Sequence, residues 1–134
     1  MNIVDSRSDK DPVVLTSREM DVMNVLWRLG SGTVSEVRKG LADDLAYTTV
    51  LTILRTLEKK GHIRHEEEGR AHRYVPIVEK EEAQEGAVRR VTRKLFSGSS
   101  ELLMAHLLAE KGLSEEQLRR LRSLVDERLN EEGK

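Results

Sequence analysis

The stretch "LAYTTVLTILRTLEKKGHIRHEEEGRAHRYVPI", residues 45–77, decides the fold because its periodicity changes halfway along. Before Gly61 the apolar residues recur at helical spacing, and after it the pattern changes to one typical of a strand, a turn and a second strand. The helical half carries four threonines, although threonine is a mediocre helix former. β-Branched hydroxyl residues at this spacing suggest a surface that contacts a partner rather than water alone.

We predict a helix from about Ala46 to Lys60, with Asp43 and Asp44 as candidate N-caps. Its buried seam follows the spacing i, i+3, i+7 and i+10 and consists of Tyr47, Val50, Leu54 and Leu57. The opposite face holds Thr48, Thr49, Thr52, Arg55, Thr56 and Lys59. The threonines therefore lie outside the predicted core.

Two further helices are predicted before this one, each opened by a capping box. The capping pairs are Thr16 with Glu19 and Thr33 with Glu36. The first helix ends at Gly30, and its apolar residues are Met20, Met23, Leu26 and Trp27. The second helix is short, with a narrow apolar stripe formed by Val34, Val37 and Leu41.

The segment after Gly61 predicts a β-hairpin. Ile63 lies on the first strand, the turn is "EGR" (residues 68–70), and the second strand carries Tyr74, Val75 and Ile77. Pro76 suits an edge or the end of a strand. Three helices followed by a hairpin is the order of a winged helix-turn-helix, so we expect a mostly α-helical fold with a small β-hairpin.

Residues 79–134 are predicted to form a separate unit of three amphipathic helices, the last opened by the capping box of Ser114 and Gln117. Short helices in about 55 residues cannot enclose a core by themselves, so a second copy of the chain is the simplest partner. The apolar positions expected at this dimer contact are Val91, Leu95, Leu103, Leu107, Leu118, Leu121 and Val125. The predicted organisation is a flexible leader at 1–14, a winged-helix domain at 15–78 and a C-terminal helical dimerisation unit at 79–134.

The composition of this 134-residue chain argues against several classes of function. The absence of cysteine excludes disulfides, thiolate chemistry and cysteine-ligated metal sites. The four aromatic residues are thin material for the walls of a deep ligand pocket. No phosphate-binding glycine loop, paired-carboxylate site or HExxH motif is present, so we expect no enzyme and no cofactor. A charged N-terminus and short apolar stretches argue against a signal peptide or membrane span, and we expect a cytoplasmic protein.

The threonine-rich helix suits DNA contact. In a helix-turn-helix the second helix lies in the major groove, where a threonine hydroxyl and methyl group can contact base edges and arginine can bind guanine or phosphate. Arg70 and Arg73 on the hairpin could reach phosphates or a minor groove, and we expect the acidic residues 66–68 to point to solvent. The net charge of −1 counts mildly against nucleic acid. Residues 46–77 are locally basic, with six Lys/Arg against four Glu.

Three motifs together resemble one family: "LTSREMDVMNVLW", "AYTTVLTILRTLEKKGHI" and "EGRAHRYVPIV" are similar to the penicillinase-repressor (BlaI/MecI/CopY) group of bacterial transcriptional repressors. The resemblance implies a winged domain that binds a palindromic promoter operator and C-terminal helices that form a homodimer. It also implies control of β-lactam-response or related genes. The residues it places against DNA are Thr48, Thr49, Thr52 and Thr56, with Arg55 one step further round and Arg70 and Arg73 on the wing.

The chain departs from the family pattern at two places. The copper-responsive branch carries a cysteine motif, which this chain lacks, so a copper-thiolate switch is excluded. The antibiotic-responsive branch is inactivated by cleavage of an Asn-Phe bond, and the matching position here is His106-Leu107. An upstream protease or sensor is therefore an open question.

Alternatives remain from other classes. The chain could be a winged-helix regulator with a ligand-sensing helical pocket, or a winged-helix protein-interaction module that does not bind DNA. His62, His65 and His72 cluster around the hairpin and could bind a metal ion, although exposed histidines in strands are the commoner case. His106 lies in an apolar helix, where a packed or interfacial histidine is expected.

Overall fold

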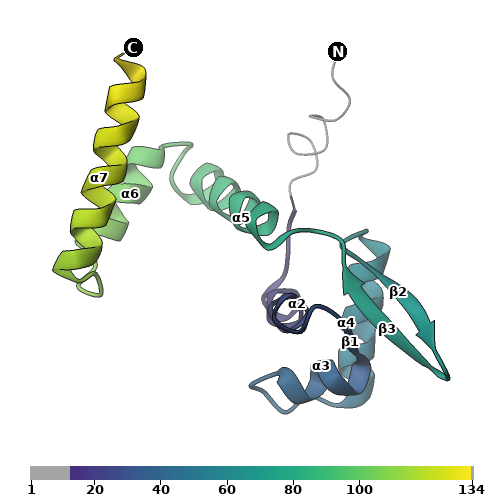
Figure 1. The fold of residues 1–134 in the computed structure, drawn as a ribbon. Helices are drawn as coiled ribbons and strands as arrows, with labels where there is room; N and C mark the ends of the chain where they lie inside the picture. Colours follow the sequence, from purple (N-terminus) through teal and green to yellow (C-terminus); the bar gives the residue numbers. More distant parts are fainter. Residues whose placement is uncertain (1–12, 134) are drawn as a thin grey trace, which may run out of the picture. The chain divides into compact units, whose positions relative to one another are not determined.

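The computed structural model describes residues 13–133 (Figure 1), which divide into two compact units. The first unit ends at Arg90 and the second begins at Val91, so the division falls inside helix α5 (Lys80–Leu95). Helices predominate, and the small antiparallel sheet belongs to the first unit. The predicted fold class is confirmed, while the proposed domain boundary after Val78 stays a prediction.

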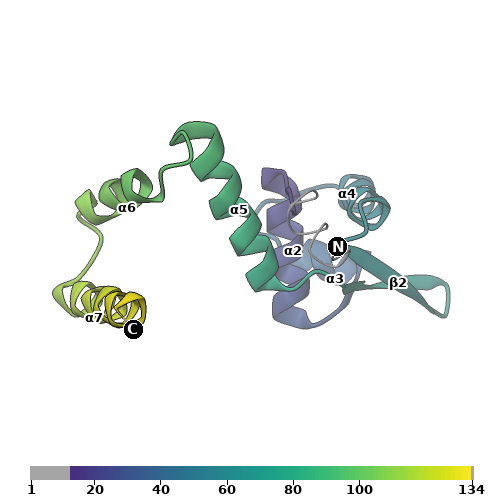
Figure 2. The same cartoon turned by 90° about the horizontal axis from the view of Figure 1, so that it is seen from above.

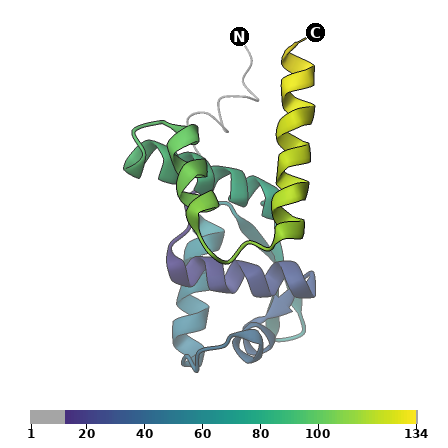
Figure 3. The same cartoon turned by 90° about the vertical axis from the view of Figure 1, so that its left-hand side faces the viewer.

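The first unit opens with helices whose bounds are α2 (Ser17–Leu29), α3 (Val34–Gly40) and α4 (Tyr47–Lys59). The capping boxes predicted for α2 and α3 are confirmed. Figure 3 shows α2 lying across α4. Val22 and Met23 of α2 are fully buried, whereas Met20 is 42% exposed.

Helix α4 begins without a side-chain cap. Its N-cap is Ala46, whose side chain makes no capping hydrogen bond. The prediction that Asp43 or Asp44 caps the helix is wrong, because the loop continues past both aspartates before α4 starts. Asp43 instead accepts a hydrogen bond of 2.6 Å from Arg18 on α2.

The predicted hairpin is confirmed as β2 (Ile63–Glu68) and β3 (Ala71–Pro76), joined at Gly69, whose φ of 62° lies in the left-handed region that glycine adopts easily. A third strand, β1 (Gly32–Thr33), was not predicted, because two residues carry no periodicity. All pairing is antiparallel, in the order β1-β3-β2. Figure 2 shows the hairpin projecting beyond the helices of this unit.

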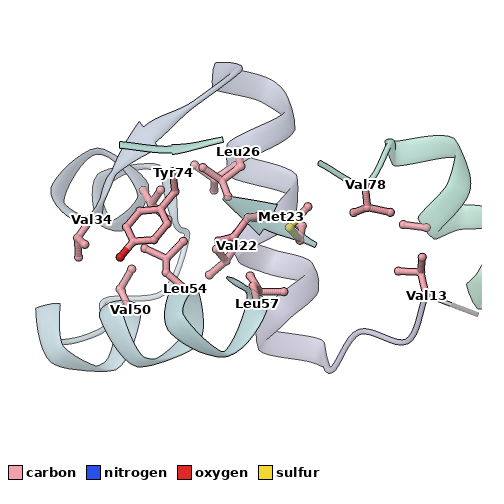
Figure 4. Packing of buried hydrophobic residues seen from close by; sticks show 14 residues of the cluster. Val13, Val22, Met23, Leu26, Val34, Val50, Leu54, Leu57, Tyr74 and Val78 are labelled. Carbon is pink, nitrogen blue, oxygen red and sulfur yellow. The ribbon is translucent and has the colours of Figure 1, made fainter. Parts of the chain in front are cut away.

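The core of the first unit lies between α2, α4 and the sheet (Figure 4). The fully enclosed residues of α4 are Val50, Leu54 and Leu57. The predicted fourth member of this seam, Tyr47, is wrong: it is 46% exposed, because it is the first residue of the helix and lies one turn before Val50. The aromatic ring in this core is that of Tyr74, from β3.

The beginning of α5 packs with the first unit. Val13 and Val78 lie together in the core (Figure 4), and Ala83 of α5 belongs to the same buried cluster. The half-buried Trp27 donates a hydrogen bond of 2.9 Å from Nε1 to the Val78 carbonyl. Residues 1–12 of the predicted leader lie outside the described residues. Val13 is buried in the core, and the bounds of the leader stay a prediction.

The second unit holds the end of α5 together with α6 (Ser100–Ala109) and α7 (Glu115–Glu132). The capping box predicted for α7 is confirmed, and Ser99 caps α6. Neither α6 nor α7 has a fully buried residue. Phe96 packs edge-on against His106, with 5.4 Å between the ring centroids. Within residues 13–133, no helix is both long and apolar enough to cross a membrane.

We predict that Gly86→Ala destabilises the first unit. Alanine favours helices, but its Cβ would lie 2.7 Å from the carbonyl oxygen of Val13, a backbone atom that cannot rotate away. The expected loss is about 1–3 kcal/mol in the free energy of unfolding, measured by urea denaturation. Gly112→Ala is the matched control, since nothing lies within 4 Å of its added Cβ. Equal stability of the two variants would contradict this close contact.

Candidate nucleic-acid interface

Helix α4 presents one exposed polar face. The five predicted DNA-contact residues on it are all exposed: Thr48, Thr49, Thr52, Arg55 and Thr56. At 100° per residue they fall within about a third of the helix circumference, opposite the buried seam. The structure therefore brings this part of the predicted site together on a single helix.

Two of the threonine hydroxyls are held against the helix backbone. Thr52 Oγ1 donates to the Thr48 carbonyl and Thr56 Oγ1 donates to the Thr52 carbonyl, each over 2.9 Å. Such bonds use the hydroxyl hydrogen but leave the oxygen able to accept. Fixed in this way, the two side chains offer a partner a methyl group and an acceptor without further ordering.

The N-terminus of α4 differs from those of α2, α3, α6 and α7, which carry Thr or Ser caps. Ala46 supplies no cap, and the first turn of α4 contains no acidic residue. The first backbone N–H groups of a helix lack partners within it, and the helix dipole adds partial positive charge there. This end of α4 is therefore suited to an anion such as a phosphate.

The two predicted wing arginines lie in different surroundings. Arg70 is exposed next to the turn at Gly69. Arg73 is 25% exposed in its side chain and forms ion pairs with Glu68 at 2.8 Å and with Glu36 at 3.0 Å. The hydrogen bonds that Arg73 donates hold the pKa of each carboxyl below its usual value of 4.5. Those carboxylates, Glu68 and then Glu36, in turn raise the pKa of Arg73.

The acidic residues 66–68 are exposed, as predicted, but two of them are also paired. Glu66 accepts from Arg64 over 2.7 Å, and Glu68 accepts from Arg73. Their charges are therefore partly neutralised within the wing. The pairing reduces the repulsion that the acidic run would exert on a phosphate.

Two of the three histidines near the hairpin stack on each other. His65 and His72 stack with 4.1 Å between ring centroids, and His65 Nδ1 lies 2.6 Å from a carboxylate oxygen of Glu58. His62 is buried and directly precedes β2. Within residues 13–133, no three His, Cys, Asp or Glu side chains come together as ligands.

A buried carboxylate makes a contact with α4 that was not predicted from the sequence. Glu19 Oε1 accepts from the Thr16 amide and from Lys60 Nζ, both over 2.8 Å, and so joins the start of α2 to the end of α4. Burial raises the pKa of Glu19, but the hydrogen bonds from Lys60 and Thr16 outweigh burial and leave the pKa below 4.5. The capping-box signal identified this glutamate but not its distant lysine.

The predicted dimerisation residues all lie in the second unit. Six are exposed and Leu103 is half-buried; the exposed ones are Val91, Leu95, Leu107, Leu118, Leu121 and Val125. The bond between His106 and Leu107, the expected cleavage position, lies inside the helical span of α6.

Comparisons with known proteins show which family the chain is similar to. The sequence matches the Penicillinase repressor family over residues 15–127. The transcriptional regulator BlaI of Mycobacterium tuberculosis (strain ATCC 25618 / H37Rv) is 37% identical over 101 residues, or 72% of this chain and 73% of that protein. The penicillinase repressor of Bacillus licheniformis is 27% identical over 118 residues, or 87% of this chain and 92% of that protein. The solution structure of monomeric Bacillus licheniformis BlaI with the blaP half-operator shares 31% identity at a TM-score of 0.47, covering 54% of this chain and 90% of that chain.

We predict that Lys60→Met destabilises the first unit by about 1–3 kcal/mol at neutral pH, because it leaves the Glu19 carboxylate buried without its cation. Lys59→Met is the matched control, since that neighbouring lysine is exposed. Urea denaturation measures both variants.

The same pair predicts a pH dependence. Because folding lowers the pKa of Glu19, its contribution is present above pH 4.5 and is lost as the pH falls through the lowered value. Lys60→Met should show a smaller loss of stability than wild type over that acidic range. Parallel pH profiles for wild type and Lys60→Met would contradict the ion pair.

Proposed function

The chain belongs to the penicillinase-repressor family, and from that membership we propose that it is a homodimeric transcriptional repressor that occupies a palindromic promoter operator. The family consists of transcriptional repressors rather than enzymes. The observation that carries the proposal is an exposed surface of α4, opposite the fully buried seam. We call this surface the threonine arc; it consists of Thr48, Thr49, Thr52, Arg55 and Thr56.

Contact with bases is assigned to this arc. An α-helix fits the major groove of B-DNA, and the N-terminal residues of a recognition helix lie nearest the base edges. Thr48, Thr49 and Thr52 occupy that end of α4 and offer methyl groups for thymine and oxygens for hydrogen bonds. Arg55 and Thr56 follow one turn later, where Arg55 can contact guanine or phosphate.

Contact with phosphates is assigned to two places. The uncapped N-terminus of α4 supplies backbone N–H groups, and the exposed guanidinium of Arg70 supplies a cation at the tip of the wing. Both lie in the first unit: one is the start of the helix that carries the threonine arc, and the other is the tip of the wing. Phosphate contacts fix the orientation on DNA, while the arc supplies sequence preference.

Dimerisation is assigned to the second unit. Helix α6 is apolar on all sides, a composition typical of helices that are buried, yet none of its residues is fully buried in the single chain. A second copy of the unit would cover these surfaces together with those of α5 and α7. Two half-sites separated by one or more helical turns of about 34 Å could then be occupied in a single bivalent event.

The genes assigned to this repressor are those of a β-lactam response or a related one, because relatives of the chain are named as penicillinase and methicillin-resistance regulators. Relief of repression by an upstream protease at His106-Leu107 is not part of the proposal. That bond lies inside α6, and its helix would have to open before a protease could bind it in extended form.

The test is a selection of the full chain against random duplex DNA at two salt concentrations. We expect a palindromic sequence whose affinity falls steeply with salt, because bound cations release counterions from DNA. Thr49→Ala and Thr52→Ala should each reduce discrimination against mismatched sites by about 1 kcal/mol without loss of folding. Ser123→Ala, an exposed helical hydroxyl on α7, is the control. No enrichment of any sequence, or unchanged preference in both threonine variants, would refute the assignment of α4.

The uncapped start of α4 gives a further prediction with opposite effects on folding and binding. Ala46→Asp should stabilise the first unit by about 0.5–1 kcal/mol, because Ala46 already has the extended conformation of an N-cap. The same carboxylate should weaken operator binding by occupying N–H groups meant for phosphate. Ala42→Asp adds an equal charge to the preceding loop without capping α4 and serves as the control. Equal loss of binding in both variants would reduce the effect to general repulsion.

A further inference from the structure

The guanidinium of Arg73 holds four segments of the first unit together. Arg73 lies on β3, and its partners are Glu68 at the end of β2, Glu36 in the first turn of α3 and Ser31 before β1. Arg73 lies opposite Thr33 of β1, and its contact with Glu68 extends towards the turn at Gly69.

Every N–H direction of this guanidinium has an acceptor. Nε and Nη2 donate to the two oxygens of Glu68 over 2.8 and 3.0 Å. Nη1 and Nη2 donate to the two oxygens of Glu36 over 3.0 and 3.3 Å, and Nη1 also donates to Ser31 Oγ over 3.2 Å. Arginine has no further donor, so a phosphate would have to displace one of these acceptors, a carboxylate or the Ser31 hydroxyl, to reach Arg73.

We propose that Arg73 is a positioning residue that fixes the wing against α3 for operator binding, and that it does not itself contact phosphate. This inference rests on the proposed function. The sequence predicts DNA contacts for both Arg70 and Arg73. Under this inference only Arg70 of the two contacts a phosphate.

The topology explains why the wing needs such a contact. Strand β1 pairs with β3 at two positions, and Thr33 opposite Arg73 is the pair nearer the tip. Beyond Arg73 the hairpin consists of two strands, and an isolated two-stranded hairpin is marginally stable. Arg73 therefore acts at the last point where a third strand supports the wing.

The partners of Arg73 connect the wing to the helix-turn-helix. Glu36 Oε1 also accepts from the Thr33 amide over 3.1 Å as part of the capping box of α3. One carboxylate thus joins the start of α3 to the wing, and α3 packs on α4. A displaced wing would present Arg70 at a different place relative to the threonine arc.

Replacing Glu68 by glutamine distinguishes the two roles of Arg73, because a positioning role and a direct phosphate contact predict opposite changes in operator affinity. If Arg73 bound phosphate, Glu68→Gln would release it and remove a repulsive charge, so affinity for operator would rise. Under the positioning role, Glu68→Gln loosens the wing and affinity should fall by about two- to thirtyfold relative to Glu67→Gln. Glu67 is the matched control, an exposed glutamate on the same strand that faces His72 rather than Arg73. Tighter binding by Glu68→Gln than by Glu67→Gln would overturn the inference.

Salt dependence gives a second test on the arginines. Arg70→Gln should lower the slope of log affinity against log salt by about 0.9, the value for one lost phosphate contact. Arg73→Gln should weaken binding while leaving that slope unchanged. A reduced slope in Arg73→Gln, like that of Arg70→Gln, would show direct contact and overturn the inference.

Hydrogen exchange of the β2 and β3 amides without DNA distinguishes failure of this inference from failure of the proposed function. Arg73→Gln and Glu68→Gln should accelerate exchange in the wing, while Glu67→Gln and the amides of α2 stay as in wild type. If wild type binds no DNA, the repressor proposal fails and the exchange data still decide whether Arg73 holds the wing. Unchanged hydrogen exchange in both Arg73→Gln and Glu68→Gln would overturn the inference, even if the wild type binds its operator.

Discussion

The burial of one side of α4 is the constraint on which the first unit depends. Val50, Leu54 and Leu57 are fully enclosed, and burying each such side chain contributes about 1.5–3 kcal/mol. Rotating α4 by one residue would turn it through about 100° and carry these side chains towards water. The packing therefore fixes the orientation of the helix. The threonine arc faces outwards as a direct result, and no additional contact is required to present it.

Two glutamates serve both local and distant structure. Glu19 and Glu36 each complete a capping box, and each also accepts a hydrogen bond from a cation far along the chain. Lys60 joins Glu19 from the end of α4, and Arg73 joins Glu36 from the wing. The starts of α2 and α3 are thereby connected to the C-terminus of α4, which carries the threonine arc, and to the wing. The arrangement of the candidate interface therefore depends on helix capping as well as on the core.

The same pair of glutamates marks how far sequence could predict this structure. The capping boxes were predictable because both partners lie three residues apart. The distant partners were not, since they lie 41 and 37 residues away and depend on how the elements pack. The error at Tyr47 has a related cause: helical spacing gives the direction of a side chain but not where the neighbouring core ends. The exposed threonines were predictable, whereas the role of Arg73 depended on contacts that only the fold supplies.

The second unit has a consequence for how long the protein persists in a cell. Neither α6 nor α7 encloses a side chain within one chain. Under the proposed dimerisation, an unpaired chain keeps these apolar helices in water, and its stability falls as the concentration of protomers falls. Proteases degrade the transiently unfolded state of a protein, which is more populated when stability is low. The rate of degradation would then depend on the concentration of the protein: it would be slow at high concentration, where chains are paired, and fast at low concentration.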